Sequence, residues 1–140
     1  MKILDTNVLS ALMRPIPDTT LQTWLDQHAP ETLSITAITV AELCYGIARL
    51  PTGQRKSTYM AQTALMFDED FAGRILPFDA DAAMIYAQVV ACRERLGRPI
   101  SQADAQIAAI CIQQEATLIT RNIKDFESLD LHTINPFLTP

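Results

Sequence analysis

The stretch Lys2-Ile3-Leu4-Asp5-Thr6-Asn7 decides the fold of this sequence. Lys2–Leu4 is a short apolar run that predicts a β-strand, and Asp5 or Thr6 could cap a helix over residues 7–13, which Pro15 and Pro17 end. A strand that leads directly into a helix is the start of a βαβ unit. Asp5 therefore falls at the carboxyl end of the first strand, which is where ligands bind in parallel α/β sheets.

The same alternation continues along the chain. Short apolar runs predict further strands at residues 32–35, 74–78, 117–120 and 132–134. Amphipathic segments between them predict helices at residues 19–28, 36–49, 54–71, 79–96 and 101–115. We therefore predict one α/β domain over residues 1–140, with a short parallel sheet of four to five strands flanked by helices on both faces.

Composition supports a globular chain. Of 140 residues, 49% are hydrophobic and 19% are charged, which excludes a disordered protein. The apolar stretches fall far short of the ~20 residues that span a bilayer, and no signal-peptide pattern begins the chain, so we expect a cytoplasmic protein without membrane association. Cys44, Cys92 and Cys111 stand far apart among apolar neighbours and are expected to be reduced, buried thiols.

The net charge of −5 argues against a protein that coats nucleic acid with a basic surface. It does not exclude a nuclease, because a cluster of carboxylates can be neutralised by bound divalent cations. No glycine-rich phosphate loop, GxSxG, CxxC or HExxH motif is present in the sequence. Nucleotide-binding loops of those types, serine hydrolases and the common zinc sites are therefore not indicated.

Two acids stand out in the first half of the chain. Asp5 is either a helix cap or a metal ligand or nucleophile at the edge of the sheet, and its position favours neither. Glu42 lies in a predominantly apolar helix with no cation three or four residues away. It is either an exposed side chain or a buried carboxylate that requires a partner such as a metal ion.

Further candidates follow in the second half. Asp104 closes the sequence Ser101-Gln102-Ala103-Asp104, which has the form of a helix-capping box and gives Asp104 a structural explanation. Asn122 and Asp125 lie in the loop after the strand at 117–120, where turn formation alone explains their residue types. Oxygen ligands of this kind are nevertheless those that Mg²⁺ prefers, and two such ions can drive phosphodiester cleavage.

Four segments resemble the motifs of the PIN-domain family, and most closely its VapC-type toxins, which include FitB-like members. In order, they are residues 4–10 (LDTNVLS), 39–46 (TVAELCYG), 103–109 (ADAQIAA) and 118–126 (LITRNIKDF). Their order and spacing agree with the family over the whole chain. One such motif would be weak, whereas four in register make a specific match.

The resemblance implies a Mg²⁺- or Mn²⁺-dependent endoribonuclease, the toxin of a bacterial type II toxin–antitoxin module. It assigns metal binding to Asp5, Glu42, Asp104 and Asn122, and catalysis to Asp5, Glu42, Asp104 and Asp125. Asn122 stands where many members have an aspartate. Thr6 and Asn7 match positions that support the first ligand.

The resemblance also implies partners: an RNA substrate, a cognate VapB-type antitoxin, a second copy of the chain in a homodimer, and operator DNA only through the antitoxin. We expect the antitoxin groove along the helices at 37–49 and 54–71, although an ordinary core explains their apolar faces equally well. Groups that steer RNA are expected among the arginines Arg14, Arg49, Arg93, Arg95 and Arg98. A solvated helix end explains residues 93–98 better. Trp24 and Phe126 are expected in the core.

Two alternatives remain open. A weakly active or inactive PIN fold that mainly binds an antitoxin and tunes operator binding is kept in view by Asn122, which adds no charge to the site. A phosphatase with Asp5 as nucleophile is disfavoured, because that chemistry needs a second acid where Asn7 stands.

Overall fold

Five parallel strands form one sheet in the order β3-β2-β1-β4-β5 within residues 1–139, the part of the chain that the computed structural model describes. The strands are β1 (Lys2–Leu4), β2 (Leu33–Thr36), β3 (Ile75–Leu76), β4 (Thr117–Ile119) and β5 (Thr133–Ile134). The predicted parallel α/β fold is therefore confirmed, with five strands.

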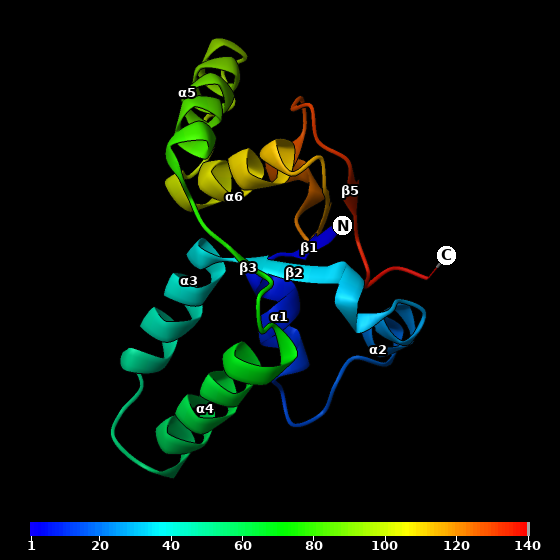
Figure 1. Ribbon diagram of the computed structural model, residues 1–140, viewed down its shortest axis with the longest axis vertical. Helices are drawn as coiled ribbons and strands as arrows, with labels where there is room; N and C mark the ends of the chain where they lie inside the picture. The colour runs from blue at the N-terminus through cyan, green and yellow to red at the C-terminus, as the bar shows by residue number, and fades with distance from the viewer. Residues whose placement is uncertain (140) are drawn as a thin grey trace.

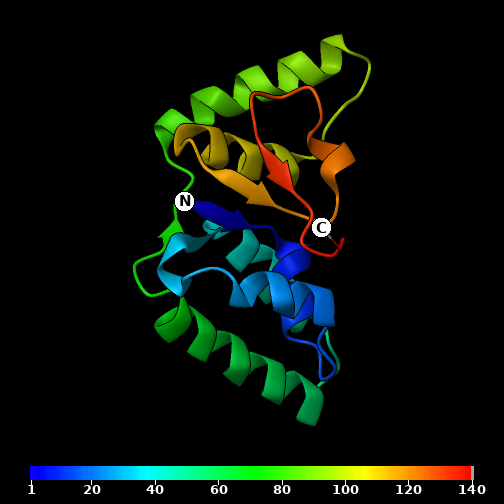
Figure 2. The same cartoon turned by 90° about the vertical axis from the view of Figure 1, so that its right-hand side faces the viewer.

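The α-helices cover both faces of this sheet. They are α1 (Thr6–Leu12), α2 (Thr19–Asp26), α3 (Ala37–Ala48), α4 (Gln54–Leu65), α5 (Ala80–Arg95) and α6 (Gln102–Gln113). Helices α5 and α6 form a pair on one face, whereas α1, α2 and α4 lie on the other (Figures 1 and 2). Helix α3 follows β2 and contacts both α4 and α6.

Successive side chains of the central strands point to opposite faces of the sheet and so pack into two separate hydrophobic cores. Ile3 and Leu118 pack with α5 and α6, whereas their chain neighbours Leu4 and Ile119 pack with residues of α1, α2 and α3. All four side chains are at most 1% exposed. Complete burial of an aliphatic side chain is worth roughly 1.5–3 kcal/mol, so a shift of register by one residue would disrupt both cores. Phe126 belongs to the first core and the half-buried Trp24 packs against the second, as predicted.

The strand order creates a topological switch point at β1. The chain runs from β1 outward through β2 to β3, and then returns to place β4 on the other side of β1. Leu4 is paired with Ile119, and the amide of Asp5 donates to the carbonyl of Ile119 at 2.9 Å. Asp5 and Thr120 are therefore the first residues beyond two adjacent strand ends, where a ligand site is expected.

Helix ends follow the predicted capping chemistry. Asp18 accepts a hydrogen bond from the amide of Leu21, and Ser101 accepts one from the amide of Asp104. Helix α5 ends in a Schellman arrangement, in which Gly97 has a φ of +67° and its amide bonds to the carbonyl of Glu94. The next amide, of Arg98, bonds to the carbonyl of Arg93 at 2.9 Å.

Some predicted boundaries were wrong. The strand expected at 74–78 has only Ile75 and Leu76 in the ladder, because Pro77 has no amide hydrogen to continue it. The helix expected at 54–71 is α-helical only to Leu65 and continues as a π-helical turn over Met66–Asp70. Short 3₁₀ turns at Pro30–Thr32 and Ile123–Phe126 were not predicted, since such turns have weak sequence signals.

The prediction of three buried cysteines is confirmed only for Cys111, because Cys92 is partly exposed and Cys44 is exposed. All three thiols are free. Helix α3 is apolar on several sides, yet only one side faces a core, so Cys44 is left on the outer surface. No helix in the described part of the chain is long and apolar enough to cross a membrane.

Candidate active site

Asp5 is the buried centre of the candidate site, with only 4% of its surface exposed. One carboxylate oxygen accepts a hydrogen bond from the amide of Thr6 at 2.8 Å and thereby caps α1. The other accepts hydrogen bonds from Thr120 Oγ1 at 2.7 Å and Asn7 Nδ2 at 3.2 Å. Burial raises the pKa of Asp5, and these donors oppose that rise by stabilising the carboxylate. Asp5 is thus a helix cap and a sheet-edge carboxylate at once.

Thr6 connects Asp5 to Glu42. Its hydroxyl donates to Glu42 Oε1 at 2.6 Å and lies 3.0 Å from the hydroxyl of Thr39. Thr39 is fully buried in the first turn of α3, one helical turn before Glu42. Glu42 itself is exposed, so the buried form considered from the sequence was wrong. Its carboxylate is oriented by a threonine, not by a cation.

Asn7 and Thr120 tie α1 to the loop after β4. The amide of Arg121 donates to Asn7 Oδ1 at 3.2 Å, and the amide of Asn122 donates to Thr120 Oγ1 at 3.0 Å. Sequence reasoning did not assign Thr120 or Thr39 to the site. The signal for Thr120 was available, because the residue that follows β4 in a parallel sheet adjoins the residue that follows β1.

Asp104 lies at the start of α6 in the electrostatic field of the other acids. Burial and the negative charges of Asp5, Asp125 and Glu42 together raise the pKa of Asp104 to about 6, against the opposing effect of a hydrogen bond with Ser101. The capping box predicted from sequence is formed, since Ser101 Oγ accepts from the Asp104 amide at 3.2 Å. The capping role and a place among the acids therefore coexist.

Asn122 and Asp125 occupy the rim. Both are exposed: Asn122 precedes the 3₁₀ turn Ile123–Phe126 and Asp125 lies within it, where the amide of Asp125 donates to the carbonyl of Asn122 at 3.0 Å. Neither side chain bonds to the network around Asp5 within residues 1–139. Asp125 influences Asp104 through its charge, whereas the neutral side chain of Asn122 adds no charge.

The donor set is chemically suited to a hard divalent cation. The charges of Asp5, Glu42 and Asp125 act on Asp104, yet none of these four acids has an ion-pair partner in the described part of the chain, where Arg98 and Glu127 form the one salt bridge. Carboxylates that repel one another are stabilised when a cation binds between them. No three acid, histidine or cysteine side chains of residues 1–139 lie close enough to ligate one ion as they stand, so binding requires these side chains to converge.

The candidate RNA-steering arginines have different environments. Arg14 is exposed and lines a hollow of about 220 Å³ together with Glu42 and Tyr59. Arg49 and Arg95 are exposed, and Arg98 pairs with Glu127 at 2.8 Å. Arg93 is only 4% exposed, so both sequence interpretations of this residue were wrong. Two of the backbone carbonyls to which its guanidinium donates lie far away in the sequence, which no local pattern reveals.

Acids gathered at the switch point of a parallel sheet define an α/β domain suited to binding a divalent cation, and comparison with known proteins specifies the family. The family model described as PIN domain matches residues 2–130. The chain therefore belongs to the PIN-domain family, as the sequence motifs indicated.

The relatives found by comparison match nearly the whole chain. The sequence is 39% identical to the VapC ribonuclease Y4jK of Sinorhizobium fredii over 137 residues, which cover 98% of each chain. It is 40% identical to Toxin FitB of Neisseria gonorrhoeae, with 98% of this chain and 99% of the relative covered. A solved structure described as FitAB bound to an IR36 DNA fragment superposes with a TM-score of 0.93 at 38% identity and covers 100% of this chain and 98% of that one.

Proposed function

We propose that this protein is an endoribonuclease, the toxin of a type II toxin–antitoxin pair, which hydrolyses RNA phosphodiester bonds with the help of a divalent metal ion. The observation that carries the proposal is the buried carboxylate of Asp5, which is joined through Thr6 to Glu42 and electrostatically to Asp104 at the switch point. The likeness to a VapC ribonuclease over the full chain supports the RNA-cleaving activity.

Asp5, Glu42 and Asp104 are the residues that would hold Mg²⁺ or Mn²⁺, with Asn122 or Asp125 at a fourth position. Such an ion supplies Lewis acidity toward a phosphate oxygen and lowers the pKa of water. Asp5 is suited to be the fixed ligand, because three hydrogen-bond donors already determine its orientation: the Thr6 amide, Asn7 Nδ2 and Thr120 Oγ1. Asn122 can contribute only its neutral carbonyl oxygen.

Glu42 and Asp104 are suited to proton transfer. Thr6 occupies Oε1 of Glu42, and the exposed carboxylate keeps a second oxygen for water or substrate. The pKa of Asp104, at about 6, lies closer to neutrality than that of an ordinary aspartate, as a group that accepts and releases a proton requires. Asn7 and Thr6 act by holding Asp5 and Glu42, and we assign them no contact with RNA.

The hollow beside Glu42 is the proposed path for RNA. Arg14 provides a cation at its rim, and Tyr59 provides an aromatic ring from α4. A guanidinium binds phosphate oxygens in a bidentate manner, and an aromatic ring stacks on bases without regard to sequence. The substrate is therefore proposed to cross α1 and α3 as a single strand.

The antitoxin is proposed to bind the apolar groove between α3 and α4. This groove has a volume of about 460 Å³ and is lined almost entirely by carbon-rich surface, including Cys44, Ile47 and Met60. An amphipathic segment can bury its apolar face there. The neighbouring structures include a toxin–antitoxin complex from Klebsiella pneumoniae at 25% identity and a TM-score of 0.70. We further propose a cytoplasmic homodimer that contacts operator DNA only through the antitoxin.

Cleavage of a cellular RNA pool by antitoxin-free protein tests this function. The wild type, Asp5→Asn and Asp130→Asn are purified in parallel and assayed with Mg²⁺, with Mn²⁺ and with EDTA. Asp130 is an exposed loop acid, so its substitution makes the same charge change away from the site. We expect discrete cuts that require metal, persist in Asp130→Asn and disappear in Asp5→Asn.

The other outcomes separate the alternatives. Cuts that survive in Asp5→Asn or in EDTA would indicate a contaminating nuclease and remove support for the site. Absence of cleavage from folded protein that also fails to bind Mn²⁺ would favour the non-catalytic antitoxin partner, which the neutral Asn122 leaves open.

A further inference from the structure

Arg93 is a buried cation for which the proposed chemistry has no use. It lies in the last turn of α5 and is 4% exposed. No carboxylate lies within ion-pair distance of it in the described residues. Its guanidinium instead donates to three backbone carbonyls: Nε to Arg98 at 2.7 Å, and Nη1 to Asp125 at 2.7 Å and to Glu127 at 3.3 Å.

The first of these carbonyls fixes the approach to α6. Gly97 turns the chain at the end of α5, and the amide of Arg98 returns to the carbonyl of Arg93. Arg93 and Arg98 are therefore joined in both directions, by main chain and by side chain. The chain then runs directly into Ser101, which caps the helix that carries Asp104.

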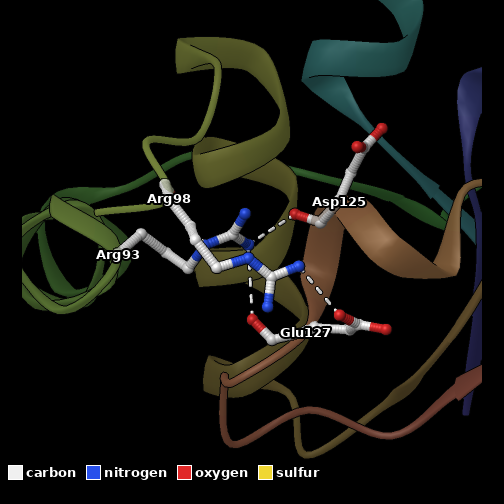
Figure 3. A network of polar contacts seen from close by, with 4 residues as sticks. All are labelled: Arg93, Arg98, Asp125 and Glu127. Atoms are coloured by element: carbon white, nitrogen blue, oxygen red, sulfur yellow. Dashed lines mark hydrogen bonds and ion pairs between the residues drawn. The ribbon is translucent and has the colours of Figure 1, made fainter. Parts of the chain in front are cut away.

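The other two carbonyls belong to the turn that carries Asp125. Nη1 of Arg93 lies between the carbonyls of Asp125 and Glu127, and the carboxylate of Asp125 points away from both guanidinium groups (Figure 3). Arg93 thus holds the backbone of Asp125 and leaves its side chain free. Because the side chain of Asp125 is exposed and has no hydrogen-bond partner within residues 1–139, its position depends on its backbone.

We propose that Arg93 is a positioning residue of the nuclease site, which clamps the Asp125 turn to the segment leading into Asp104 and so fixes the spacing of these two acids. The proposal rests on the proposed function. Like charges on Asp104 and Asp125 favour separation of the two segments in the metal-free protein, and the clamp opposes that separation. Three carbonyls converge on one side chain, so the clamp acts on both segments together.

The planar guanidinium is specifically required for this contact. Its donors leave in fixed, divergent directions, which allows one group to bind three carbonyls on two segments. A lysine ammonium keeps the charge but cannot reproduce the fork. A methionine of similar length keeps the packing but leaves buried carbonyls without donors.

A second contact between the same segments provides a matched control. Arg98 Nη2 donates to Glu127 Oε2 at 2.8 Å, with both side chains 46% exposed. Exposed ion pairs contribute little to stability. Glu127→Gln therefore changes the same turn, removes its salt bridge and leaves the Arg93 clamp in place.

The test is a double-mutant cycle between Arg93→Lys and Asp125→Asn, with steady-state RNA cleavage as the readout. We expect Arg93→Lys to lower kcat by roughly tenfold or more with KM changed by less than about twofold, because the clamp acts on an acid and not on RNA. The double variant should then lose no more than about twofold beyond Asp125→Asn alone. Glu127→Gln should stay within about twofold of the wild type.

Amide hydrogen exchange gives a readout that does not depend on activity. In Arg93→Lys, the amides of Asp125 and Glu127 should exchange about tenfold faster, while those of β1 and α6 keep their rates. Arg93→Met is measured in parallel, so that if one variant fails to fold, the other still tests the clamp. If the wild type cuts no RNA, the proposed function fails, while the exchange data still show whether the clamp exists.

Two results would overturn the proposal. The first is additive loss in the cycle, which indicates that Arg93 does not act through Asp125. The second is unchanged exchange in the turn, or faster exchange throughout the core, which indicates a general contribution to stability instead of a clamp.

Discussion

Thr120 Oγ1 donates a 2.7 Å hydrogen bond to Asp5 Oδ2 across 115 residues of sequence. Both residues lie just beyond the ends of neighbouring parallel strands, and both are almost completely buried. The pKa of Asp5 is raised by burial and lowered by this hydroxyl. The bond therefore helps to keep a buried carboxylate ionised at the edge of the sheet.

Thr120→Val should reduce the free energy of unfolding by about 2 kcal/mol at pH 7, because a hydrogen bond to a charged group is lost while the shape is kept. The pKa of Asp5 should rise further in this variant. Since Thr120 stabilises the ionised form, the difference between variant and wild type should shrink as the pH falls and Asp5 becomes protonated. Urea unfolding of both proteins at pH 7 and at pH 4 measures this difference in the free energy of unfolding.

Thr117→Val serves as the control for this substitution, because Thr117 begins the same strand at its opposite end and has only a long 3.4 Å contact with His132. Equal losses in the two variants would show that the effect belongs to the strand and not to Asp5.

Asp104→Asn should stabilise the metal-free protein. The pKa of Asp104 is raised from its ordinary 3.8 to about 6, so the folded state binds more protons than the unfolded state between these values. Stability is then lost as the pH rises through this range. A shift of this size corresponds to roughly 3 kcal/mol, which we discount to about 1 kcal/mol because the carboxyl is partly exposed to solvent.

The expected result is a higher Tm for Asp104→Asn at pH 7 in EDTA, with convergence on the wild type near pH 4. Asp130→Asn makes the same change on an exposed loop and should leave the pH profile unaltered. A Tm for Asp104→Asn below the wild type at pH 7 would contradict the assigned repulsion.

Most of the fold could be predicted from the sequence. The apolar runs at β1, β2 and β4 and the capping residues Asp18 and Ser101 were recognised from local patterns, because strands and helix ends are specified by neighbouring residues. The pairing of Asp5 with the end of β4 followed from strand topology. The end of β3 was predicted wrongly because it is set by the single residue Pro77. As an edge strand, β3 pairs only with β2 within residues 1–139, so its neighbours do not mark its length.

Contacts between distant segments account for what local patterns missed. Nothing in the local sequence distinguishes Thr39 and Thr120 from other threonines. Their roles follow only from the fold, which places Thr39 beside Thr6 and Thr120 beside Asp5. Arg93 was predicted to be a surface cation, yet two of its three acceptors lie 32 and 34 residues further along the chain. Buried hydroxyls and guanidinium groups satisfied by remote carbonyls leave no periodic signal, so only the tertiary structure reveals them.

Thr6→Val should impair catalysis more than stability. The variant loses the 2.6 Å hydrogen bond to Glu42 Oε1, so Glu42 becomes free to rotate away from the metal site. We expect kcat for RNA cleavage to fall by about tenfold, since small misplacements of a reacting group are costly. Thr6→Ser keeps the hydroxyl and should retain most of the activity. Equal activities of the serine and valine variants would argue against this role.

Thr63→Val should stabilise the protein. Thr63 is 4% exposed in α4 and lines the groove between α3 and α4, and its Oγ1 is a buried polar atom without a hydrogen-bond partner in the described part of the chain. Valine has nearly the same shape and is likewise β-branched, so the substitution removes the unsatisfied hydroxyl without opening a cavity. A buried polar group without a partner costs about 1–3 kcal/mol, so we expect the free energy of unfolding in urea to rise by about 1 kcal/mol.

Thr58→Val, at an exposed position on the same helix, controls for helix propensity and should change stability by less than about 0.5 kcal/mol. Loss of stability in Thr63→Val would show that the hydroxyl has a partner in solution, such as a water molecule bound in the groove.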